Sequence, residues 1–518
     1  MKIYKYALNK LPQFNNLKEL VKLRESFDNK VAFKYKEHKQ IKTKSATEFR
    51  EDIDFLGTYL FNLGVKSSKV ALIGENSYEW ILSYFAVVNG GNVIVPIDKE
   101  LSDDDIIALI DKCGIDAVIY SDSYAEVADR VKNVKLLNMR DFDEYISAGK
   151  KLIEAGDREY KDYAVDSNSL CAIIYTSGTT GASKGVMLSH KNISADVISA
   201  CQNVYIAGDS MLTLPLHHTF AFSAGVVVML LYGLTICINT SLRTFKDDLL
   251  LYRPQNICVV PLYVETLYKN IWAAAKEQKK DKLLKMMMPV SSALHKMGID
   301  IRRKLFQSVI AGLGGKLDLI ISGGAPINEK YINFFTSIGV TVLNGYGITE
   351  CAPVVAVNRN KCFIEGSVGL IISCNQVKVK EDEILVKGDN VMLGYYDNEQ
   401  ATSDAFDDGW FKTGDLGYIK DDYLFITGRK KNLIILSNGK NVSPEELESL
   451  IQNIPNVTEC IVYAENDVIT AEIYALNPDG IQDGIKELNK SLPLYKQIQR
   501  VKFRETEFAK TTTKKIKR

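Results

Sequence analysis

The first feature that could do chemistry is a stretch rich in glycine and hydroxyl side chains. It reads Tyr175-Thr-Ser-Gly-Thr-Thr-Gly-Ala-Ser-Lys-Gly185 and follows an apolar run that predicts a β-strand. Glycines let the backbone turn its N–H groups toward an anion, and the hydroxyls and lysine add donors and positive charge. Ser183 stands where a Walker A loop needs glycine. A flexible linker has a similar composition, but the position after a strand favours a polyphosphate site, with candidate contacts Thr176, Ser177, Gly178, Thr179, Thr180, Gly181 and Lys184.

Further motifs follow this loop along the chain. They read Ser322-Gly-Gly-Ala-Pro326, Asn344-Gly-Tyr-Gly-Ile-Thr-Glu350, Trp410-Phe-Lys-Thr-Gly-Asp415 and Gly428-Arg-Lys-Lys431. Each one alone reads equally well as a surface turn. Their occurrence together in this order resembles the acyl-adenylate-forming superfamily, which includes acyl-CoA synthetases, peptide-synthetase adenylation domains and firefly-type luciferases. The resemblance covers about residues 70–518, most of the chain.

The resemblance implies a nucleotide site. In it Tyr346 stacks on adenine, Thr349 meets the α-phosphate, and Asp415 and Arg429 contact the ribose. A carboxylate suits the ribose because it accepts hydrogen bonds from two adjacent hydroxyls. The remaining implied nucleotide contacts are Gly324, Ala325, Asn344, Gly345 and Gly347.

A metal and a set of catalytic residues are also implied. The resemblance places Mg²⁺ at Glu350 and Thr180, and Mg²⁺ commonly takes one carboxylate, phosphate oxygens and several waters. The implied catalytic residues are Glu350, Thr180, Lys184, His218 and a lysine near the end of the chain.

The C-terminal part of the chain carries the motifs of a mobile domain. The segment Asn438-Gly-Lys-Asn-Val-Ser-Pro-Glu-Glu-Leu-Glu448 is similar to the family's entry to that domain. Lys431 falls at the family's hinge position, and Gly439 and Lys440 fall on its thiol channel. Ser443 is a plausible N-cap for the helix that Pro444 opens.

The last residues depart from the family pattern. The family ends on Thr/Ser-Gly-Lys-Ile, whereas this chain reads Lys510-Thr-Thr-Thr-Lys-Lys-Ile-Lys-Arg518. Alignment on Ile516 makes Lys515 the lysine that enters the active site during adenylation, and Lys514 is its rival. Without the upstream motifs this basic segment would read as a solvated tail.

The segment Leu214-Pro-Leu-His-His218-Thr-Phe bears on the acid substrate. In the family the position of His218 gates the carboxylate end of the acyl pocket, although a histidine beside a helix start is often structural. This segment, Ser-Gly-Gly-Ala-Pro and the basic ending look most like the long-chain fatty acyl-CoA synthetase branch. Apolar residues around 220–235 either line a tunnel for the alkyl chain or belong to the core.

The elements that must position these residues follow a β-α rhythm. From Val70, short apolar runs alternate with amphipathic stretches, which predicts parallel sheets layered with helices. Ligands in such sheets bind beyond the carboxyl ends of the strands, where the motifs stand. After residue 365 the alternation shortens and predicts a β-rich subdomain. We therefore expect an α/β domain over 1–430 and a small mobile α+β domain over 431–518.

Composition narrows the class of protein. Lys plus Arg and Asp plus Glu both number 64, so no excess charge argues for a nucleic-acid partner. Nine scattered cysteines without a Cys-x-x-Cys pair argue against a disulfide framework or metal cluster. The first residues lack an apolar signal-like stretch. The apolar run 222–238 is short for a membrane span and reads as a buried helix followed by a strand. We expect a cytoplasmic location, with peripheral attachment to a membrane left open.

The function expected from all of this is ATP-dependent activation of a carboxylic acid to its acyl-adenylate, followed by thioester formation with coenzyme A (CoA). The expected small-molecule partners are the acid, a medium- to long-chain fatty acid, together with ATP, Mg²⁺ and CoA. Three alternatives stay open: an acyl carrier protein as acceptor, a free-standing amino-acid adenylation domain, and a nucleotide-binding regulator without catalysis.

Overall fold

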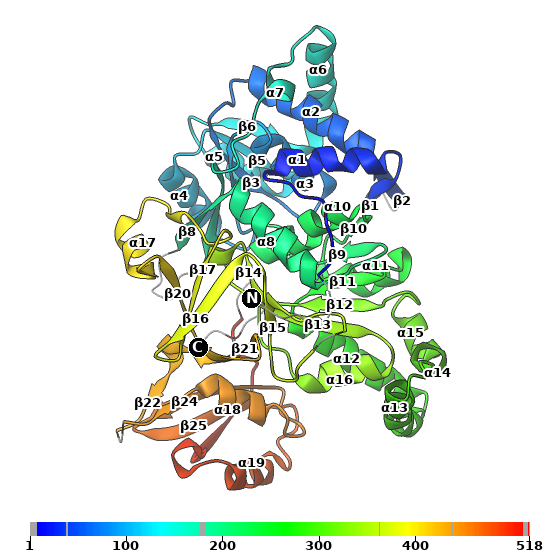
Figure 1. Cartoon of the computed structure of the whole chain (residues 1–518), viewed down its shortest axis with the longest axis vertical. Helices are drawn as coiled ribbons and strands as arrows, with labels where there is room; N and C mark the ends of the chain where they lie inside the picture. Colours follow the sequence, from blue (N-terminus) through cyan, green and yellow to red (C-terminus); the bar gives the residue numbers. More distant parts are fainter. Residues whose placement is uncertain are drawn as a thin grey trace. The chain divides into compact units, whose positions relative to one another are not determined.

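The computed structural model describes residues 8–37, 40–176, 183–361, 363–437, 439–510 and 516. The chain forms two compact units (Figure 1). The first comprises 1–363, 369–376 and 387–404, and the second comprises 364–368, 377–386 and 405–518. The β-rich subdomain therefore groups with the C-terminal segment. The division into compact units does not show where the chain would rotate. The hinge at Lys431 and the domain boundary at residue 430 therefore stay predictions.

One sheet of the first unit has the strand order β18-β8-β7-β4-β3-β5-β6. Strands β7, β4, β3, β5 and β6 run parallel, as the β-α rhythm predicts, whereas β8 and β18 are antiparallel additions at one edge. The strands are β3 (Lys69–Ile73), β4 (Val93–Pro96), β5 (Ala117–Tyr120), β6 (Lys135–Asn138), β7 (Leu170–Thr176), β8 (Lys184–Ser189) and β18 (Gly394–Tyr395).

Helices cover both faces of this sheet. In β3, Ala71 and Ile73 pack with residues of α4 and α5, while α3 contacts β3 and β4. Fully buried central strands are typical of sheets covered on two sides. Outside them, α2 lies along α6 and α7 (Figure 1). The helices are α1 (Leu17–Leu23), α2 (Ala46–Asn62), α3 (Tyr78–Val88), α4 (Asp103–Cys113), α5 (Ala125–Arg130), α6 (Phe142–Glu154) and α7 (Glu159–Asp162).

Local signals explain where several helices begin and end. Ser45 and Glu48 form a capping box at the start of α2. Ser102 caps α4, and Gly114, with φ +60°, ends it in the left-handed conformation that glycine tolerates. These signals fix the helix ends that the sheet then packs against.

The second sheet of the first unit runs β15-β14-β13-β12-β11-β9-β10-β1-β2. It is parallel from β13 to β1 and antiparallel at both ends. The strands are β1 (Val31–Glu37), β2 (Gln40–Ser45), β9 (Ser210–Leu212), β10 (Ile236–Ile238), β11 (Asn256–Val259), β12 (Leu319–Ser322), β13 (Thr341–Gly347), β14 (Val354–Val357) and β15 (Gly369–Ile371).

Helices pack on one face of this sheet around Ile257, Val259 and Ile320 of its strands. Residues of α11, α12, α13, α15 and α16 complete that core, and these helices lie together in Figure 1. The helices are α8 (His190–Asn203), α11 (Phe245–Tyr252), α12 (Pro261–Glu277), α13 (Asp281–Lys296), α14 (Arg302–Leu305), α15 (Gln307–Gly312) and α16 (Glu329–Ser337).

The apolar run 222–238 is the buried helix and strand that its sequence predicts. It comprises the end of α9 (Thr219–Phe222), a π-helical turn, α10 (Val228–Tyr232) and β10. Gly233, with φ +68°, ends the helix. Among the described residues, no helix has the length and apolar character needed to cross a membrane. The eight described cysteines are all free thiols.

The second unit contains three sets of paired strands, one of which is the short antiparallel pair β22-β23. Strands β16-β17-β20-β21 form another set, with β19 paired to β20, and β24-β25-β26 form the third, with helices α18 and α19 packed in its core. These sheets and helices confirm the β-rich and α+β secondary structure expected from the sequence. The elements are β16 (Asn375–Lys380), β17 (Glu383–Gly388), α17 (Glu399–Ala405), β19 (Phe406–Asp407), β20 (Trp410–Lys420), β21 (Tyr423–Arg429), β22 (Ile434–Ile435), β23 (Asn441–Val442), α18 (Pro444–Ile451), β24 (Glu459–Glu465), β25 (Val468–Tyr474), α19 (Ile481–Ser491) and β26 (Arg500–Arg504). Of these, β16, β17 and α17 cross between the units along the chain.

The expected cap at α18 is wrong. Ser443 stands at the N-cap position, but its side chain makes no capping hydrogen bond. Its Oγ instead donates to the carbonyl oxygen of Thr427 at 2.6 Å. The Ser443 hydroxyl therefore bonds to a residue of β21 and does not cap the helix.

Candidate active site

The ends of the predicted phosphate loop are held by a β-hairpin. Thr176, the last residue of β7, pairs directly with Lys184, the first residue of β8. Ser183 Oγ donates to the carbonyl oxygen of Thr176 at 3.0 Å. The loop therefore leads into a strand at the antiparallel edge of the sheet. Five of its predicted contacts lie outside the described residues, and their roles stay predictions: Ser177, Gly178, Thr179, Thr180 and Gly181.

A compact charged cluster stands beside the loop ends. Tyr395 of β18 pairs with Val186 of β8, and Lys184 Nζ lies 4.7 Å from the centre of the Tyr395 ring. Tyr395 Oη donates to Glu350 Oε1 at 2.9 Å. The structure thus brings together Lys184 and Glu350, which the sequence proposed separately, and adds Tyr395 between them.

Tyr395 is a neutral donor in this cluster. Its side chain is 8% exposed, and burial first, then the nearby Glu350 carboxylate, raises the pKa of the phenol well above its ordinary value. The cation over the ring face adds an electrostatic attraction to the same residue. Tyr395 therefore holds the carboxylate and the lysine in one place without adding charge.

The backbone around Glu350 is fixed by buried polar side chains. Asn390 Nδ2 donates to the carbonyl oxygen of Cys351 at 2.7 Å and to Asp196 Oδ1 at 3.1 Å. Asp196, which is 1% exposed, also accepts from the backbone N–H of Val354 at 2.8 Å. Burial raises the pKa of Asp196, and these two hydrogen bonds oppose that rise. The network ties α8 to the turn that carries Glu350.

Two glycine motifs emerge side by side at the carboxyl edge of the second sheet. Ser322 at the end of β12 pairs with Asn344 of β13 in parallel register. Gly324 has φ +81°, a conformation that other residues rarely adopt. It leads into Ala325. Gly324 and Ala325 thus follow the end of β12, and Asn344, Gly345 and Gly347 lie in the last part of the neighbouring strand β13, near the edge where ligands of parallel sheets bind.

The strand that carries Tyr346 is closely packed by backbone. A Cβ atom on Gly347 would lie 2.1 Å from the carbonyl oxygen of Pro353, and one on Gly345 would lie 3.1 Å from that of Ala356. Gly347 therefore admits no side chain. Asn344, at the other end of the motif, is held by Asn358 through a 2.6 Å side-chain hydrogen bond. Thr349 lies in the single 3₁₀ turn, Thr349–Cys351, that presents Glu350.

The predicted gate histidine has a histidine neighbour. His218 stands at the N-cap position of α9 and makes no capping hydrogen bond through its side chain. Its ring centre lies 4.0 Å from that of His217. Burial lowers the pKa of His217 well below its ordinary value, and His217 Nε2 lies 3.3 Å from Asp98 Oδ1. The gate role of His218 remains a prediction.

The predicted ribose contacts form a pair in the second unit. Asp415 of β20 lies opposite Arg429 of β21, and Arg429 Nε is 3.0 Å from Asp415 Oδ1. Thr413 Oγ1 accepts from the backbone N–H of Asp415 at 3.0 Å. The Asp415 side chain is 4% exposed and that of Arg429 is 43% exposed. The pairing fixes the carboxylate at one strand end.

The predicted hinge and thiol channel lie further along the same unit. Lys431 sits in the 3₁₀ turn Lys430–Asn432. Gly439 and Lys440 fall in the turn between β22 and β23, where Gly439 has φ +74° and Lys440 Nζ lies 5.9 Å from the Tyr495 ring centre. Lys514 and Lys515 lie outside the described residues. Their roles stay predictions.

Sequence reasoning missed Tyr395, Asn390 and Asp196. None stands in a motif with a chemical signature, and the two-residue strand that carries Tyr395 is too short for periodicity to predict. Only its pairing with β8 reveals that Tyr395 faces Glu350 and Lys184. An aspartate within the helical pattern of α8 would ordinarily be read as a surface residue.

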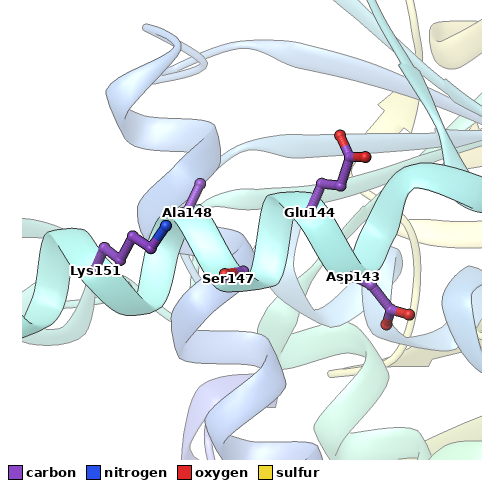
Figure 2. A pocket seen from close by; sticks show the side chains of 5 residues that line it. All are labelled: Asp143, Glu144, Ser147, Ala148 and Lys151. Carbon is purple, nitrogen blue, oxygen red and sulfur yellow. The ribbon is translucent and has the colours of Figure 1, made fainter.

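A shallow hollow lies along α6, away from all of these residues. Asp143, Glu144, Ser147, Ala148 and Lys151 line it, and Figure 2 shows that they all come from this one helix. A single helix offers no opposing wall to enclose a ligand, so we assign this hollow no role. Within the described residues, no cluster of three or more histidine, cysteine or acidic side chains suits a metal ion.

Comparison with known families gives a match over most of the chain. Residues 23–396 match the family described as AMP-binding enzyme. This span contains the loop, His218, both glycine motifs, Glu350 and Tyr395.

Individual relatives agree with that match. The chain is 29% identical over 462 residues to a long-chain-fatty-acid–CoA ligase of Mycobacterium bovis, covering 83% of this chain and 76% of the relative. It is 28% identical over 542 residues to a chloroplastic long-chain-fatty-acid–[acyl-carrier-protein] ligase of Arabidopsis thaliana, covering 85% and 73%. Its fold is similar to that of the O-succinylbenzoate CoA synthetase of Bacillus subtilis solved with ATP and magnesium ion, with a TM-score of 0.73, 22% identity and coverage of 96% and 98%.

Proposed function

This chain belongs to the AMP-binding enzyme family, and we propose that it joins a carboxylic acid to the thiol of CoA while ATP is cleaved to AMP and pyrophosphate. The observation that carries the proposal is the cluster of Lys184, Tyr395 and Glu350 at the ends of the 177–182 loop. It sets a positive charge and a carboxylate suited to Mg²⁺ beside a segment whose composition suits a polyphosphate. Activation by ATP needs that combination.

In the first half-reaction a carboxylate oxygen of the acid forms a bond to the α-phosphorus of ATP. The bond from that phosphorus to the bridging oxygen breaks, and pyrophosphate leaves with the electron pair. The acid is already a carboxylate, so no general base is needed. Both reactants are anions, which makes positioning and charge neutralisation the main contributions of the protein. Lys184 and, by resemblance, Lys515 supply positive charge.

Glu350 fits the role of magnesium ligand. One carboxylate together with phosphate oxygens and waters satisfies Mg²⁺, and Tyr395 orients Glu350 through one of its two oxygens. Such an ion, when bound, neutralises phosphate charge. Thr180 is the second proposed contact. The similar Bacillus subtilis synthetase was solved with both ATP and magnesium ion, which supports the pairing.

In the second half-reaction a thiol sulfur attacks the acyl carbon of the mixed anhydride. The carbon–oxygen bond to AMP breaks, and the thiol gives up its proton. By resemblance, the C-terminal domain rotates at Lys431 between the two steps, and Gly439 and Lys440 line the path of the thiol. In this structure Ser443 bonds to Thr427 across the proposed pivot, so a rotation there must break or carry that hydrogen bond.

We propose a medium- to long-chain fatty acid as the substrate. The names of the two relatives support it, as do the motifs of the long-chain branch. Each buried methylene contributes about 0.8 kcal/mol, so specificity should rise with chain length until the pocket is filled. The acceptor has a second candidate, an acyl carrier protein, because the plant relative is named for that acceptor.

A panel assay tests the acid and the acceptor together. Purified full-length chain is given ATP, Mg²⁺ and acids from acetate to stearate, with benzoate and amino acids included, and either CoA or holo-acyl carrier protein. We expect thioester formation to be highest with fatty acids of about ten or more carbons, and with CoA. Best activity on acetate, benzoate or an amino acid would overturn the fatty-acid assignment, and a strong preference for the carrier protein would overturn CoA.

A further inference from the structure

We propose that helix α13 and the turn after it form a docking surface for an anionic lipid bilayer. The surface has an apolar stripe, which we define as Leu283, Met286, Val290, Met297 and Ile299. These side chains are between 47% and 71% exposed. Exposed large apolar residues gathered on one element mark an interaction site more often than scattered ones do. This inference goes beyond the catalytic proposal and does not depend on it.

The stripe lies on one side of the helix. Leu283, Met286, Val290 and Met297 follow spacings of three, four and seven residues, which place side chains on one helical face. Leu284 and Ser291 lie on another face and are buried. Helix α13 is therefore amphipathic, and its exposed side is partly apolar.

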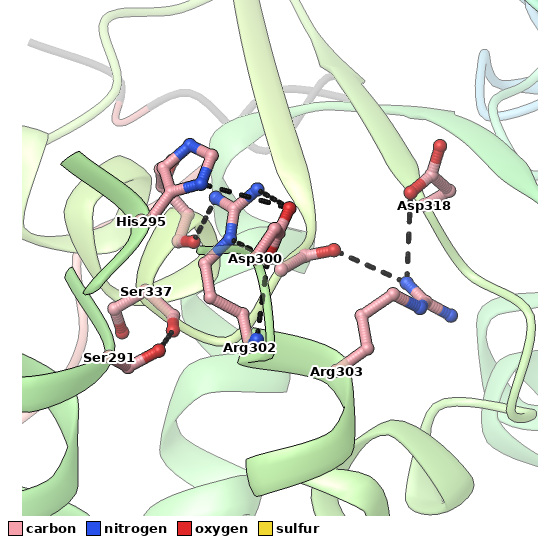
Figure 3. Close-up of polar contacts among 9 residues, drawn as sticks. Ser291, His295, Asp300, Arg302, Arg303, Asp318 and Ser337 are labelled. Carbon is pink, nitrogen blue, oxygen red and sulfur yellow. Dashed lines mark hydrogen bonds and ion pairs between the residues drawn. The ribbon is translucent and has the colours of Figure 1, made fainter. Parts of the chain in front are cut away.

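The buried side of α13 is anchored, so the stripe cannot turn inward. Ser291 Oγ donates to the carbonyl oxygen of Ser337 in α16 at 2.8 Å, as Figure 3 shows. Leu284 packs in the core formed with α12 and α16. Rotating the stripe toward the core would break this hydrogen bond and expose Leu284.

The segment that carries the stripe is rich in positive charge. Residues 276–304 contain nine lysines and arginines but only three acidic residues. All seven lysines are exposed, and within the described part of the chain none of them forms an ion pair; they are Lys276, Lys279, Lys280, Lys282, Lys285, Lys296 and Lys304. Lysines can extend their charged ends to headgroups while their stems lie on apolar surface.

The two arginines of the segment, unlike its lysines, form hydrogen bonds and ion pairs within the protein. Arg302 binds both carboxylate oxygens of Asp300, at 2.8 and 2.7 Å. Arg303 donates to the carbonyl oxygens of Leu317 and Gly339 and lies 3.7 Å from Asp318. Figure 3 shows the contacts of Arg302 with Asp300 and of Arg303 with Asp318. They fix the turn that follows the stripe, and the surface charge comes from the lysines.

Charge complementarity indicates which kind of partner binds this surface. An apolar helix face bordered by lysines is typical of helices that lie in the headgroup region of an anionic membrane. A second copy of the chain would bring the same lysines against one another, because a symmetric interface pairs a surface with itself. An anionic bilayer satisfies both the stripe and the charges.

Vesicle flotation with the full chain tests this surface. We expect the chain to float with phosphatidylcholine vesicles that contain phosphatidylglycerol, and to float much less with pure phosphatidylcholine or at raised ionic strength. Met286→Asp with Met297→Asp should lower the bound fraction roughly tenfold or more, because charges then face the acyl region. Lys282→Glu with Lys285→Glu should weaken binding to the anionic vesicles only.

The matched control is Leu476→Asp, at a leucine that is 86% exposed in the second unit, and it should float like wild type. Circular dichroism and melting temperature verify that each variant is folded. If wild type floats with neither kind of vesicle, the proposal is wrong. Wild-type flotation by the methionine variant also overturns it, as would self-association of the free chain that the same variant abolishes.

Discussion

The phenol of Tyr395 donates a 2.9 Å hydrogen bond to Oε1 of Glu350. It joins the two-residue strand β18 to the turn that presents the proposed magnesium carboxylate. Lys184, at the end of the phosphate loop, stands over the same phenol ring. Three segments distant in sequence therefore meet at one tyrosine.

Tyr395→Phe removes this hydrogen bond and keeps the ring. A hydrogen bond to a charged group contributes about 1.5–3 kcal/mol, so we expect the rate of adenylation to fall roughly tenfold to a hundredfold. The Mg²⁺ concentration needed for half-maximal rate should rise, since the carboxylate is then less well oriented. Steady-state kinetics over a Mg²⁺ titration measure both effects.

Tyr396→Phe is the control for that variant. The Tyr396 hydroxyl contacts Lys69 Nζ at 2.8 Å and donates to the carbonyl oxygen of Cys113 at 3.2 Å, which are not site residues. Its adenylation rate should stay close to that of wild type. Unchanged kinetics in Tyr395→Phe, or equal losses in the two variants, would show that the contact with Glu350 has no special role.

Glu350→Gln keeps an oxygen that can accept from Tyr395 but removes the negative charge. We expect ATP binding to persist while Mg²⁺-dependent turnover falls by roughly a hundredfold or more, because charge stabilisation at the transferring phosphoryl group is lost. Calorimetric ATP binding and a Mg²⁺ titration of the rate separate the two quantities. A wild-type rate at saturating Mg²⁺ would refute the metal assignment.

His190 should make the protein sensitive to acid. It is fully buried, its Nδ1 accepts from the backbone N–H of Leu17 at 3.3 Å, and burial lowers its pKa from 6.5 to about 4. The unfolded chain therefore takes up this proton more readily than the native state. The contribution is present above pH 6.5 and is lost as the pH falls toward 4, at about 1.4 kcal/mol per pH unit, or roughly 3 kcal/mol in all.

Urea unfolding at several pH values between 4 and 7 measures this dependence. His190→Asn offers an oxygen near the place of Nδ1 and does not titrate, so its stability should change less over the same window. If His190→Asn and wild type lose stability in parallel, then His190 is not responsible.

The two tail lysines can be separated by their half-reactions. Lys515→Ala should slow formation of the acyl-adenylate by roughly a hundredfold or more, as loss of a preorganised charge does. Given preformed acyl-adenylate and CoA, the same variant should form thioester at nearly the wild-type rate. Lys514→Ala is the control and should be mild in both assays. If Lys514→Ala abolishes adenylation instead, the alignment of the tail is off by one residue.

Lys431→Pro should show the opposite pattern to Lys515→Ala. Proline fixes φ near −65° and should hinder rotation at the proposed hinge, which slows thioester formation while adenylation persists. Equal losses in both half-reactions for Lys515→Ala would mean that the lysine is structural, and the proposed domain rotation would lose its support.

Much of the framework could be predicted from the residues. The β-α rhythm that the sequence predicts from Val70 is found in β3, α3 and β4, because a buried apolar run bounded by turns leaves few other conformations. The antiparallel edge of β8 and β18 was not foreseen, since periodicity does not reveal strand direction. Ser443 was misread because its partner, Thr427, is supplied by another strand.

The residues of the candidate site also fall into two groups, those that the sequence predicts and those that only the structure reveals. Lys184, Glu350, Asp415 and Arg429 carry charges in glycine-rich motifs, and the sequence marks them individually. Their neighbours are set by tertiary pairing alone. Tyr395 has no motif of its own, and Asp196 is distinguished only by its burial and its hydrogen bonds to Val354 and Asn390.

The central claim is that this chain makes an acyl-adenylate, and exchange of labelled pyrophosphate into ATP without any thiol tests it most directly. We predict rapid exchange that requires both Mg²⁺ and a fatty acid such as palmitate, that is absent with amino acids, and that Glu350→Gln largely abolishes. Addition of CoA should then release AMP and acyl-CoA in equal amounts. No exchange with any acid, under conditions where the chain binds ATP, would contradict the account and favour a nucleotide-binding protein without catalysis.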